Sequence, residues 1–311
     1  MDIAKYTEFL VSKFEIISPK DLYSLNNNEG FQPNIYFILG LKKYYYSKET
    51  KIIDKNKGAI YIKLQSKDGD IIETNTILTD SENPYISKGF NPLVINKLSF
   101  NADMSEMIIN ENFRYPFDYI YPWIRENTPK YKVLYIGQGQ GSEDNPRDAI
   151  IRLKDHNTLQ KILADCNVNY LDYKIELLLL EFQQKNFFTN LGKVEEAHMH
   201  LSDEIPFDSN LFKEFPEHSQ TINFIEAVLI NYFKPEYNVK YIKGIVPKKQ
   251  HSSYNQFYSE NYNSSILNLE AFDEIGILYT DRVEFNARKK GYIDANINEE
   301  KSFDEFLNSN L

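Results

Sequence analysis

Six polar side chains in the middle and C-terminal parts of the chain are of the types that could cut a phosphodiester bond. They are Tyr121, Tyr135, Arg152, His156, Glu226 and Asn238. The set combines groups that can carry protons, a fixed cation and one carboxylate. These are the groups that an enzyme needs to hydrolyse a phosphodiester with a single divalent metal. The chemistry depends on whether the fold brings them together.

The carboxylate of Glu226 lies inside the apolar run FIEAVLINYF. A carboxylate in such a helix either faces water at the edge of the apolar stripe or is partly buried beside a partner. Burial without a partner would cost several kcal/mol or would neutralise the group. A hard divalent cation is one suitable partner, because Mg²⁺ commonly takes one or two carboxylates and keeps several waters. The position alone leaves both interpretations open.

Arg152 and His156 are four residues apart in IIRLKDH, so a helix places them on the same face. The Arg guanidinium provides a permanent cation whose donors suit a phosphate oxygen. The His imidazole can donate or accept a proton near neutral pH. A pair of plain surface side chains is the alternative interpretation.

The two tyrosines are expected on neighbouring strands. Tyr119 and Tyr121 share one face of the first strand, and Tyr135 and Gly137 share one face of the next. The chain contains 23 tyrosines. A half-buried aromatic side chain in a sheet is therefore the alternative for either tyrosine taken by itself.

The elements that carry these residues form a β-β-α-β-α pattern over residues 113–245. The runs FDYIYPWI and KVLYIGQ predict two adjacent strands. A helix is expected to begin near Asn145 and Pro146 and to continue through DAIIRLKDHNTLQKILADC. The run YKIELLLLEF predicts a buried strand, and TINFIEAVLINYF predicts a second helix that ends before Pro235.

The flanking segments are expected to be separate. Residues 1–112 predict a β-rich N-terminal domain that begins with a helix at 2–15 and contains a hairpin, AIYIKLQ and DIIETNTIL, around the turn SKDGD. Residues 246–311 predict a C-terminal extension. We expect the N-terminal domain to serve in recognition or regulation.

The composition excludes several classes of protein. Cys166 is the single cysteine, so neither an intrachain disulfide nor a cysteine-based zinc site can form. The N-terminal residues lack the pattern of a signal peptide, and no run of some 18 apolar residues predicts a membrane span. We expect a soluble, cytoplasmic protein that does not bind membranes. The net charge of −10 is unusual for a nucleic-acid enzyme, although a local basic groove can lie on an acidic body.

Taken in order, these motifs resemble those of the GIY-YIG nuclease family. The resemblance rests on YIG at 135–137, the tyrosine strand before it, Arg-x-x-x-His on the next helix, and Glu226 followed by Pro-x-x-Asn. It covers residues 117–240, and the spacings are closest to those of the restriction endonucleases of the family. The first triplet departs from the family pattern, because Tyr119-Ile120-Tyr121 lacks the glycine. The resemblance implies an α/β (α+β) fold whose core is a three-stranded antiparallel sheet flanked by helices.

The resemblance also implies roles for the residues that handle protons and charge. Tyr121 would activate the attacking water as general base, and Tyr135 would orient that base or the scissile phosphate. Arg152 would neutralise charge that grows on the phosphorane. His156 would assist proton transfer or hold Tyr121.

The remaining roles concern the metal. Glu226 would be the only protein ligand of one Mg²⁺, or alternatively Mn²⁺, and Asn238 would hydrogen-bond near that centre. The implied activity is a metal-dependent endonuclease acting on double-stranded DNA in restriction or anti-phage defence, with a homodimer needed to cut both strands. Two alternatives stay open: a toxin or abortive-defence nuclease acting on RNA or on DNA non-specifically, and a binding module on a degenerate nuclease fold.

Overall fold

The chain divides into two compact units. The structure, a computed structural model, describes residues 4–24, 30–78, 93–116, 130–139, 149–166, 168, 172–190, 216–242, 252–259 and 262–297. Unit 1 comprises Met1–Leu39, Lys132–Ala164 and Ile175–Leu311, and unit 2 comprises Gly40–Tyr131 and Asp165–Lys174. Neither unit begins or ends at residue 112, where the sequence predicts a domain boundary. The first 39 residues belong to the unit that carries the candidate site, and unit 2 is inserted after them.

A mixed sheet of eight strands runs through unit 1. The strands are β1 (Ala4–Ile17), β2 (Ile35–Lys42), β10 (Lys130–Gln138), β11 (Tyr173–Asn190), β12 (Tyr262–Asn268), β13 (Ile277–Tyr279), β14 (Glu284–Phe285) and β15 (Tyr292–Asn296). Their order is β14-β13-β10-β2-β11-β1-β12-β15. Strand β1 is antiparallel to β11 and parallel to β12. The fold is thus α+β, as expected, but this sheet is larger than three strands and is not purely antiparallel.

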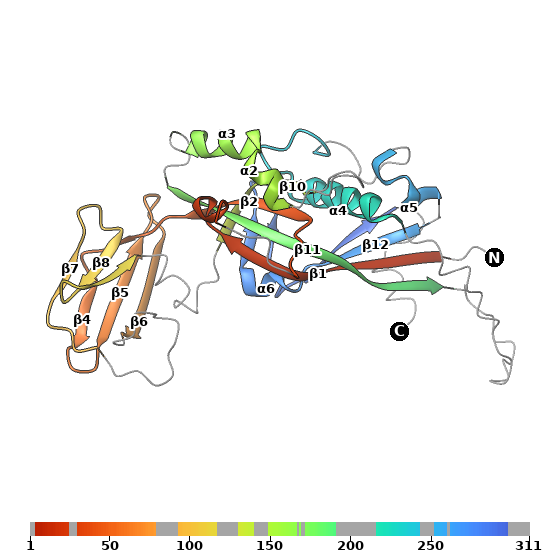
Figure 1. The fold of residues 1–311 in the computed structure, drawn as a ribbon. Coiled ribbons are helices and arrows are strands. Elements are labelled where there is room, and N and C mark those ends of the chain that lie inside the picture. Colours follow the sequence, from red (N-terminus) through yellow and green to blue (C-terminus); the bar gives the residue numbers. More distant parts are fainter. Residues whose placement is uncertain are drawn as a thin grey trace, which may run out of the picture. The chain divides into compact units, whose positions relative to one another are not determined.

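The N-terminal segment is a strand, and the helix expected at residues 2–15 is wrong. Thr7, Phe9 and Val11 are buried in alternation with partly exposed neighbours, which is the two-residue period of a strand. Figure 1 shows β1 and β11 side by side as long strands. Pairing along most of the length of β1 therefore decides its conformation, because the ladder satisfies the backbone groups and buries one face.

Helices cover both faces of this sheet. They are α2 (Ala149–Lys154), α3 (Asn157–Cys166), α4 (His218–Phe233), α5 (Gln256–Ser259) and α6 (Phe272–Ile275), with short 3-10 turns at Pro19–Asp21 and Ser252–Tyr254. Phe37 of β2 packs edge-on against Phe233 of α4 and Phe272 of α6. Its neighbour Tyr36 points to the opposite face, toward His156, which follows α2. Within the described residues, no helix is both long and apolar enough to cross a membrane.

Helix α4 is close to the helix expected from TINFIEAVLINYF. It ends at Phe233, and its C-cap Lys234 adopts the left-handed conformation with φ of 50° and donates its N–H to the carbonyl of Ile230. Pro235 follows and cannot extend the helical hydrogen bonding. The chain therefore turns sharply after α4.

Unit 2 contains two small sheets. One has β3 (Tyr45–Tyr46), β5 (Ala59–Gln65) and β4 (Lys51–Asp54), with β6 (Ile71–Ile77) paired to β5, and the other has β7 (Leu98–Phe100), β8 (Glu106–Ile109) and β9 (Phe113–Pro116). The expected hairpin is confirmed, since Gln65 pairs with Ile71 and Gly69 in its turn has φ of 93°. That positive φ explains the glycine.

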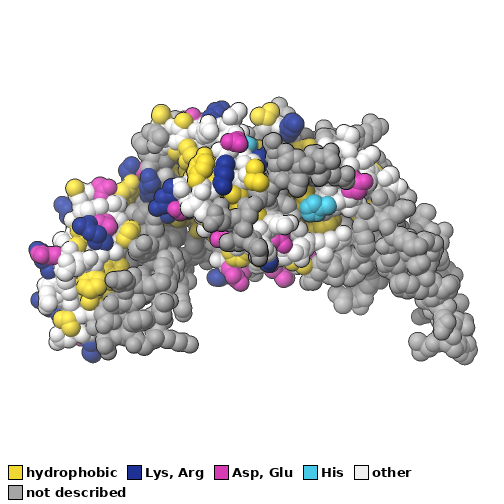
Figure 2. Space-filling model, in the orientation of Figure 1, with side chains coloured by type: hydrophobic (Ala, Val, Ile, Leu, Met, Phe, Trp, Pro, Cys, Tyr) yellow, Lys and Arg dark blue, Asp and Glu magenta, His cyan; other side chains and the backbone are white. Residues whose placement is uncertain are grey.

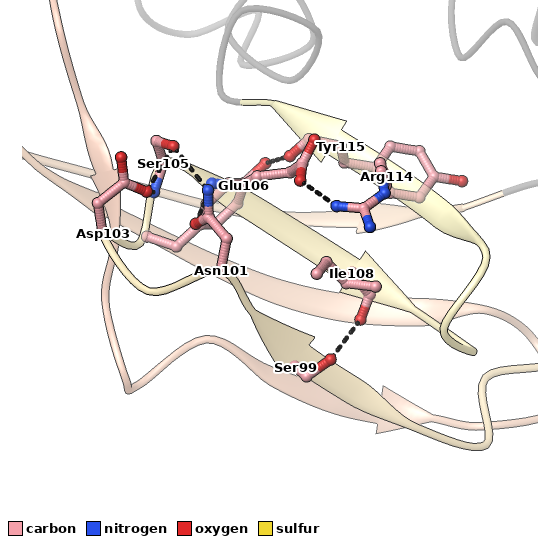
Figure 3. A network of polar contacts seen from close by, with 9 residues as sticks. Ser99, Asn101, Asp103, Ser105, Glu106, Ile108, Arg114 and Tyr115 are labelled. Carbon is pink, nitrogen blue, oxygen red and sulfur yellow. Dashed lines mark hydrogen bonds and ion pairs between the residues drawn. The ribbon is translucent and has the colours of Figure 1, made fainter.

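Polar contacts hold the second of these sheets together at its turn and along its strands. Asn101 donates to the hydroxyl of Ser105 at 2.9 Å and accepts from the backbone N–H of Glu106 at 2.9 Å, as Figure 3 shows. The carboxylate of Glu106 pairs with Arg114 on the next strand at 2.7 Å.

Lysines in unit 2 are paired with acidic side chains. Lys42, which precedes Lys43 in the sequence, contacts Asp68 at 2.8 Å and Asp70 at 2.6 Å. Lys63 contacts Glu49 at 2.8 Å and Glu73 at 3.3 Å. Figure 2 likewise shows basic and acidic side chains interspersed on the face of the described residues that it presents. Much of the positive charge of these two lysines is therefore offset locally.

Candidate active site

Two tyrosines from neighbouring strands contact each other at the centre of the large sheet. Tyr36 of β2 and Tyr135 of β10 have ring centroids 6.1 Å apart. Gly137, in the YIG triplet, makes this approach feasible. A Cβ added at Gly137 would lie 2.5 Å from the hydroxyl oxygen of Tyr36 and 2.8 Å from the Tyr135 ring. The absence of a side chain at Gly137 therefore leaves the space that the Tyr36 hydroxyl occupies.

His156 completes a cluster of three rings. Its Nε2 lies 3.3 Å from the Tyr36 hydroxyl oxygen, and its ring centroid lies 5.8 Å from that of Tyr36 and 5.2 Å from that of Tyr135. The backbone fixes His156 at the junction of α2 and α3, because its N–H donates to Leu153 and its carbonyl accepts from Gln160. The imidazole is thereby held against both tyrosines.

Arg152 supplies positive charge to this cluster from the last turn of α2. Burial lowers the pKa of His156 below its usual value, and the nearby Arg152 guanidinium lowers it further. The same guanidinium favours the ionised form of each tyrosine. The imidazole is therefore neutral at neutral pH and can accept a proton.

The tyrosine hydroxyls are protonated at neutral pH. Burial raises the pKa of Tyr36 far above its ordinary value, and the charges that Tyr135 and Glu226 can carry raise it further. Burial and Glu226 also raise the pKa of Tyr135, while Arg152 and a hydrogen bond with Tyr36 oppose this. Neither tyrosine can act as a base by losing its proton to water. The Nε2 of neutral His156, at 3.3 Å, is the available acceptor for the Tyr36 proton.

Glu226 extends the cluster from α4. It is partly buried, and burial raises the pKa of its carboxyl to about 7, against the opposing effects of Arg152, Lys240 and hydrogen bonds from Gln138. These hydrogen bonds come from both the backbone N–H and the side chain of Gln138, the last residue of β10. The interpretation of Glu226 as a carboxylate on a freely solvated surface therefore does not hold.

Asn238 acts on the backbone of the strand. Its Nδ2 donates to the carbonyl of Ile136 at 2.8 Å, and its Oδ1 accepts from the N–H of Ile136 at 2.9 Å. Tyr237 adds a third bond, from its N–H to the carbonyl of Leu134 at 3.1 Å. The turn after α4 thus docks on β10 between Tyr135 and Gly137. Asn238 fixes the strand that presents Tyr135.

The arrangement suits a hard divalent cation held by few protein ligands. In the part of the chain that the structure describes, no group of three or more His, Cys, Asp or Glu side chains could hold a metal. Glu226 offers one carboxylate, and the buried Oε1 of Gln138 has no hydrogen-bond partner among the described residues. Mg²⁺ fits such a site, because it binds through one or two carboxylates and keeps several waters.

Four of the six residues expected from the sequence come together in this way: Tyr135, Arg152, His156 and Glu226. Asn238 supports them through the backbone of β10. Tyr121 lies outside the described residues. The tyrosine that the structure places beside Tyr135 and His156 is Tyr36, which the sequence analysis missed.

A signal for Tyr36 was present in NIYFILG. That run is apolar throughout and carries a tyrosine directly after an isoleucine, as in the family triplet. Gln138 was also missed, although it follows the YIG triplet directly.

Comparison with known proteins adds no relative. No protein-family model matches the chain, no curated protein matches its sequence, and no solved structure matches its fold.

Proposed function

We propose that the protein is a metal-dependent endonuclease that hydrolyses phosphodiester bonds in DNA, with a site of the GIY-YIG type. One observation carries the proposal. Tyr36 and Tyr135 are far apart in the sequence but lie on neighbouring strands, and both contact the ring of His156. Arg152 and Glu226 lie within electrostatic reach of both tyrosines. The proposed core of the family consists of β2, β10 and β11 with α2 and α4.

The first tyrosine of the pair is reassigned to Tyr36. In the family pattern that tyrosine receives the proton of the attacking water. As the water attacks phosphorus, its proton passes to the Tyr36 hydroxyl oxygen, and the hydroxyl proton passes to Nε2 of His156. The water oxygen forms a bond to phosphorus, and the bond from phosphorus to the leaving oxygen breaks. The relay avoids a free tyrosinate, which the raised pKa of Tyr36 disfavours.

Charge and orientation come from three other residues. Arg152 neutralises the negative charge that grows on the phosphorane oxygens. Tyr135 orients Tyr36 or the scissile phosphate, and Glu226 holds Mg²⁺, or alternatively Mn²⁺. When bound, the cation stabilises the leaving oxygen as a Lewis acid. Protonated His156 is left with the proton, which it returns to solvent or to the leaving group.

We assign the activity to restriction or anti-phage defence on double-stranded DNA in the cytoplasm. Unit 2 is inserted between the two strands that carry the tyrosines, and we propose that it serves in target recognition or regulation. A homodimer would be required to cut both strands at one site. The proposal predicts that double-stranded DNA yields discrete fragments.

A toxin or abortive-defence nuclease that acts on RNA, or on DNA non-specifically, is the second candidate. The net charge of −10 favours it, because weak attraction for phosphates is compatible with an enzyme that depends on a partner or activator for substrate affinity. A binding module on a degenerate fold is the least favoured candidate, since the reactive side chains contact one another.

A comparison of substrates separates these candidates. The full chain is incubated with methylated plasmid, unmethylated plasmid, phage DNA and RNA, each with Mg²⁺ and with EDTA. Discrete DNA bands that require Mg²⁺ support site-specific restriction, whereas degradation of RNA or a smear of DNA supports the second candidate. Metal-independent binding without cleavage of any substrate would support the degenerate module.

A further inference from the structure

Gln138 links the YIG strand to the helix that carries Glu226. Its backbone N–H and its side-chain amide both lie near the Glu226 carboxylate and favour its ionised form, which lowers the pKa of that carboxyl. Its Nε2 also lies 2.6 Å from Oδ1 of Asn223. Asn223 and Glu226 are three residues apart, so they lie on the same face of α4. Gln138 therefore bridges two polar groups of that helix.

These contacts determine which way the amide of Gln138 points. The Nε2 of Gln138 lies 2.6 Å from an acceptor, the Oδ1 of Asn223, and near the Glu226 carboxylate, so the nitrogen faces this side. The oxygen Oε1 then takes the remaining position, where it is buried and has no hydrogen-bond partner among the described residues. Most buried amide oxygens have a donor.

We propose that Gln138 is a positioning residue of the cation site. Its N–H groups hold one oxygen of the Glu226 carboxylate, and its Oε1 accepts a hydrogen bond from a water that the cation keeps. The inference rests on the proposed function, because it assumes that Glu226 holds Mg²⁺. A site with a single carboxylate ligand depends on such contacts, since Mg²⁺ retains most of its waters and these need acceptors.

Binding of Mn²⁺ to the full chain in the absence of nucleic acid tests this role. The free ion is titrated with protein and measured by electron paramagnetic resonance at pH 8. The variant Gln138→Met has a similar size but neither donor nor acceptor, and we expect it to bind Mn²⁺ about 10 to 100 times more weakly than the wild type. Binding within about twofold of the wild type would overturn the inference.

Gln220→Ala is the matched control. Gln220 lies on α4, the helix that carries Glu226. Its Oε1 is likewise buried without a partner among the described residues, but its Nε2 donates to the carbonyl of Ser252 instead. We expect this variant to bind Mn²⁺ as the wild type does. Equal weakening in both variants would overturn the inference, because the effect would then be a general disturbance of α4.

Two further variants make the result decisive. Gln138→Glu keeps an acceptor oxygen and adds negative charge, so it should bind Mn²⁺ at least as tightly as the wild type, and it decides the question if Gln138→Met does not fold. Weaker binding by Gln138→Glu would contradict the inference. Glu226→Gln should lose binding. If it binds like the wild type, the proposed metal ligand is wrong; if it loses binding while Gln138→Met does not, only the role of Gln138 is wrong.

Discussion

Replacing Glu226 by glutamine should stabilise the metal-free protein at alkaline pH. Burial raises the pKa of this carboxyl from 4.5 to about 7 in the folded chain. Between these pH values the folded protein keeps a proton that the unfolded chain loses. The unfolding free energy of the wild type therefore falls as the pH rises through this window, and the loss is complete above pH of about 7.

The size of the effect follows from the same two pKa values. At about 1.36 kcal/mol for each pH unit, keeping Glu226 charged costs about 3 kcal/mol. The side chain is only partly buried, so solvent screening reduces the cost, and we expect a difference of about 1 to 3 kcal/mol. The neutral amide of Glu226→Gln avoids this cost. Saturating Mg²⁺ should restore stability to the wild type only, because a ligand that binds the folded state stabilises it.

Urea unfolding followed by circular dichroism measures the difference. The wild type and Glu226→Gln are compared at pH 5 and at pH 8 in EDTA, with Glu274→Gln as the control because Glu274 is exposed on α6. We expect Glu226→Gln to gain stability relative to the wild type at pH 8 but little at pH 5. The reasoning would be refuted if the difference in unfolding free energy between the two proteins did not change with pH, or if the wild type were more stable than the variant at pH 8.

Three other substitutions have distinct expected outcomes. Tyr36→Phe should lower the cleavage rate about 10²- to 10⁴-fold, as expected for the loss of a proton carrier; Tyr46→Phe, which removes a buried hydroxyl bonded to a carbonyl in unit 2, should leave the rate unchanged. Gly137→Ala should destabilise the protein by about 1 to 3 kcal/mol in thermal unfolding and abolish cleavage, because the new Cβ would displace the Tyr36 hydroxyl. Asn238→Ala should leave the backbone of Ile136 without two hydrogen bonds, which costs about 1 to 3 kcal/mol, and should lower kcat with little change in the Mn²⁺ affinity. An unchanged rate in Tyr36→Phe, a fully active Gly137→Ala or an Asn238→Ala variant as stable as the wild type would contradict the corresponding role.

The sequence predicted those elements whose conformation is decided by local patterns. The long apolar run of β11 and the apolar helix α4 are both present, and so is the hairpin of β5 and β6. Arg152 and His156 lie near Tyr135, but they do not share one helix as the sequence predicted, because α2 ends at Lys154 and His156 lies at its junction with α3. Local chemistry was sufficient for the strand, the helix α4 and the hairpin.

Non-local pairing explains what the sequence did not predict. Tyr36 was missed because unit 2 separates β2 from β10, whereas strands that pair are usually close in sequence. Such an insertion costs little free energy, since its two ends leave neighbouring strands and the entropy of closing a loop grows slowly with its length. The strand β1 was taken for a helix because its partners, β11 and β12, lie far along the chain.

Cleavage of double-stranded DNA by the wild type and by Glu226→Gln, at equal concentration with saturating Mg²⁺, tests the central claim most directly. The account predicts that the wild type cuts the DNA, that EDTA stops it, and that the variant does not cut although it folds. Cleavage by Glu226→Gln at the rate of the wild type, or a wild type that cuts no DNA with Mg²⁺ or Mn²⁺, would contradict it.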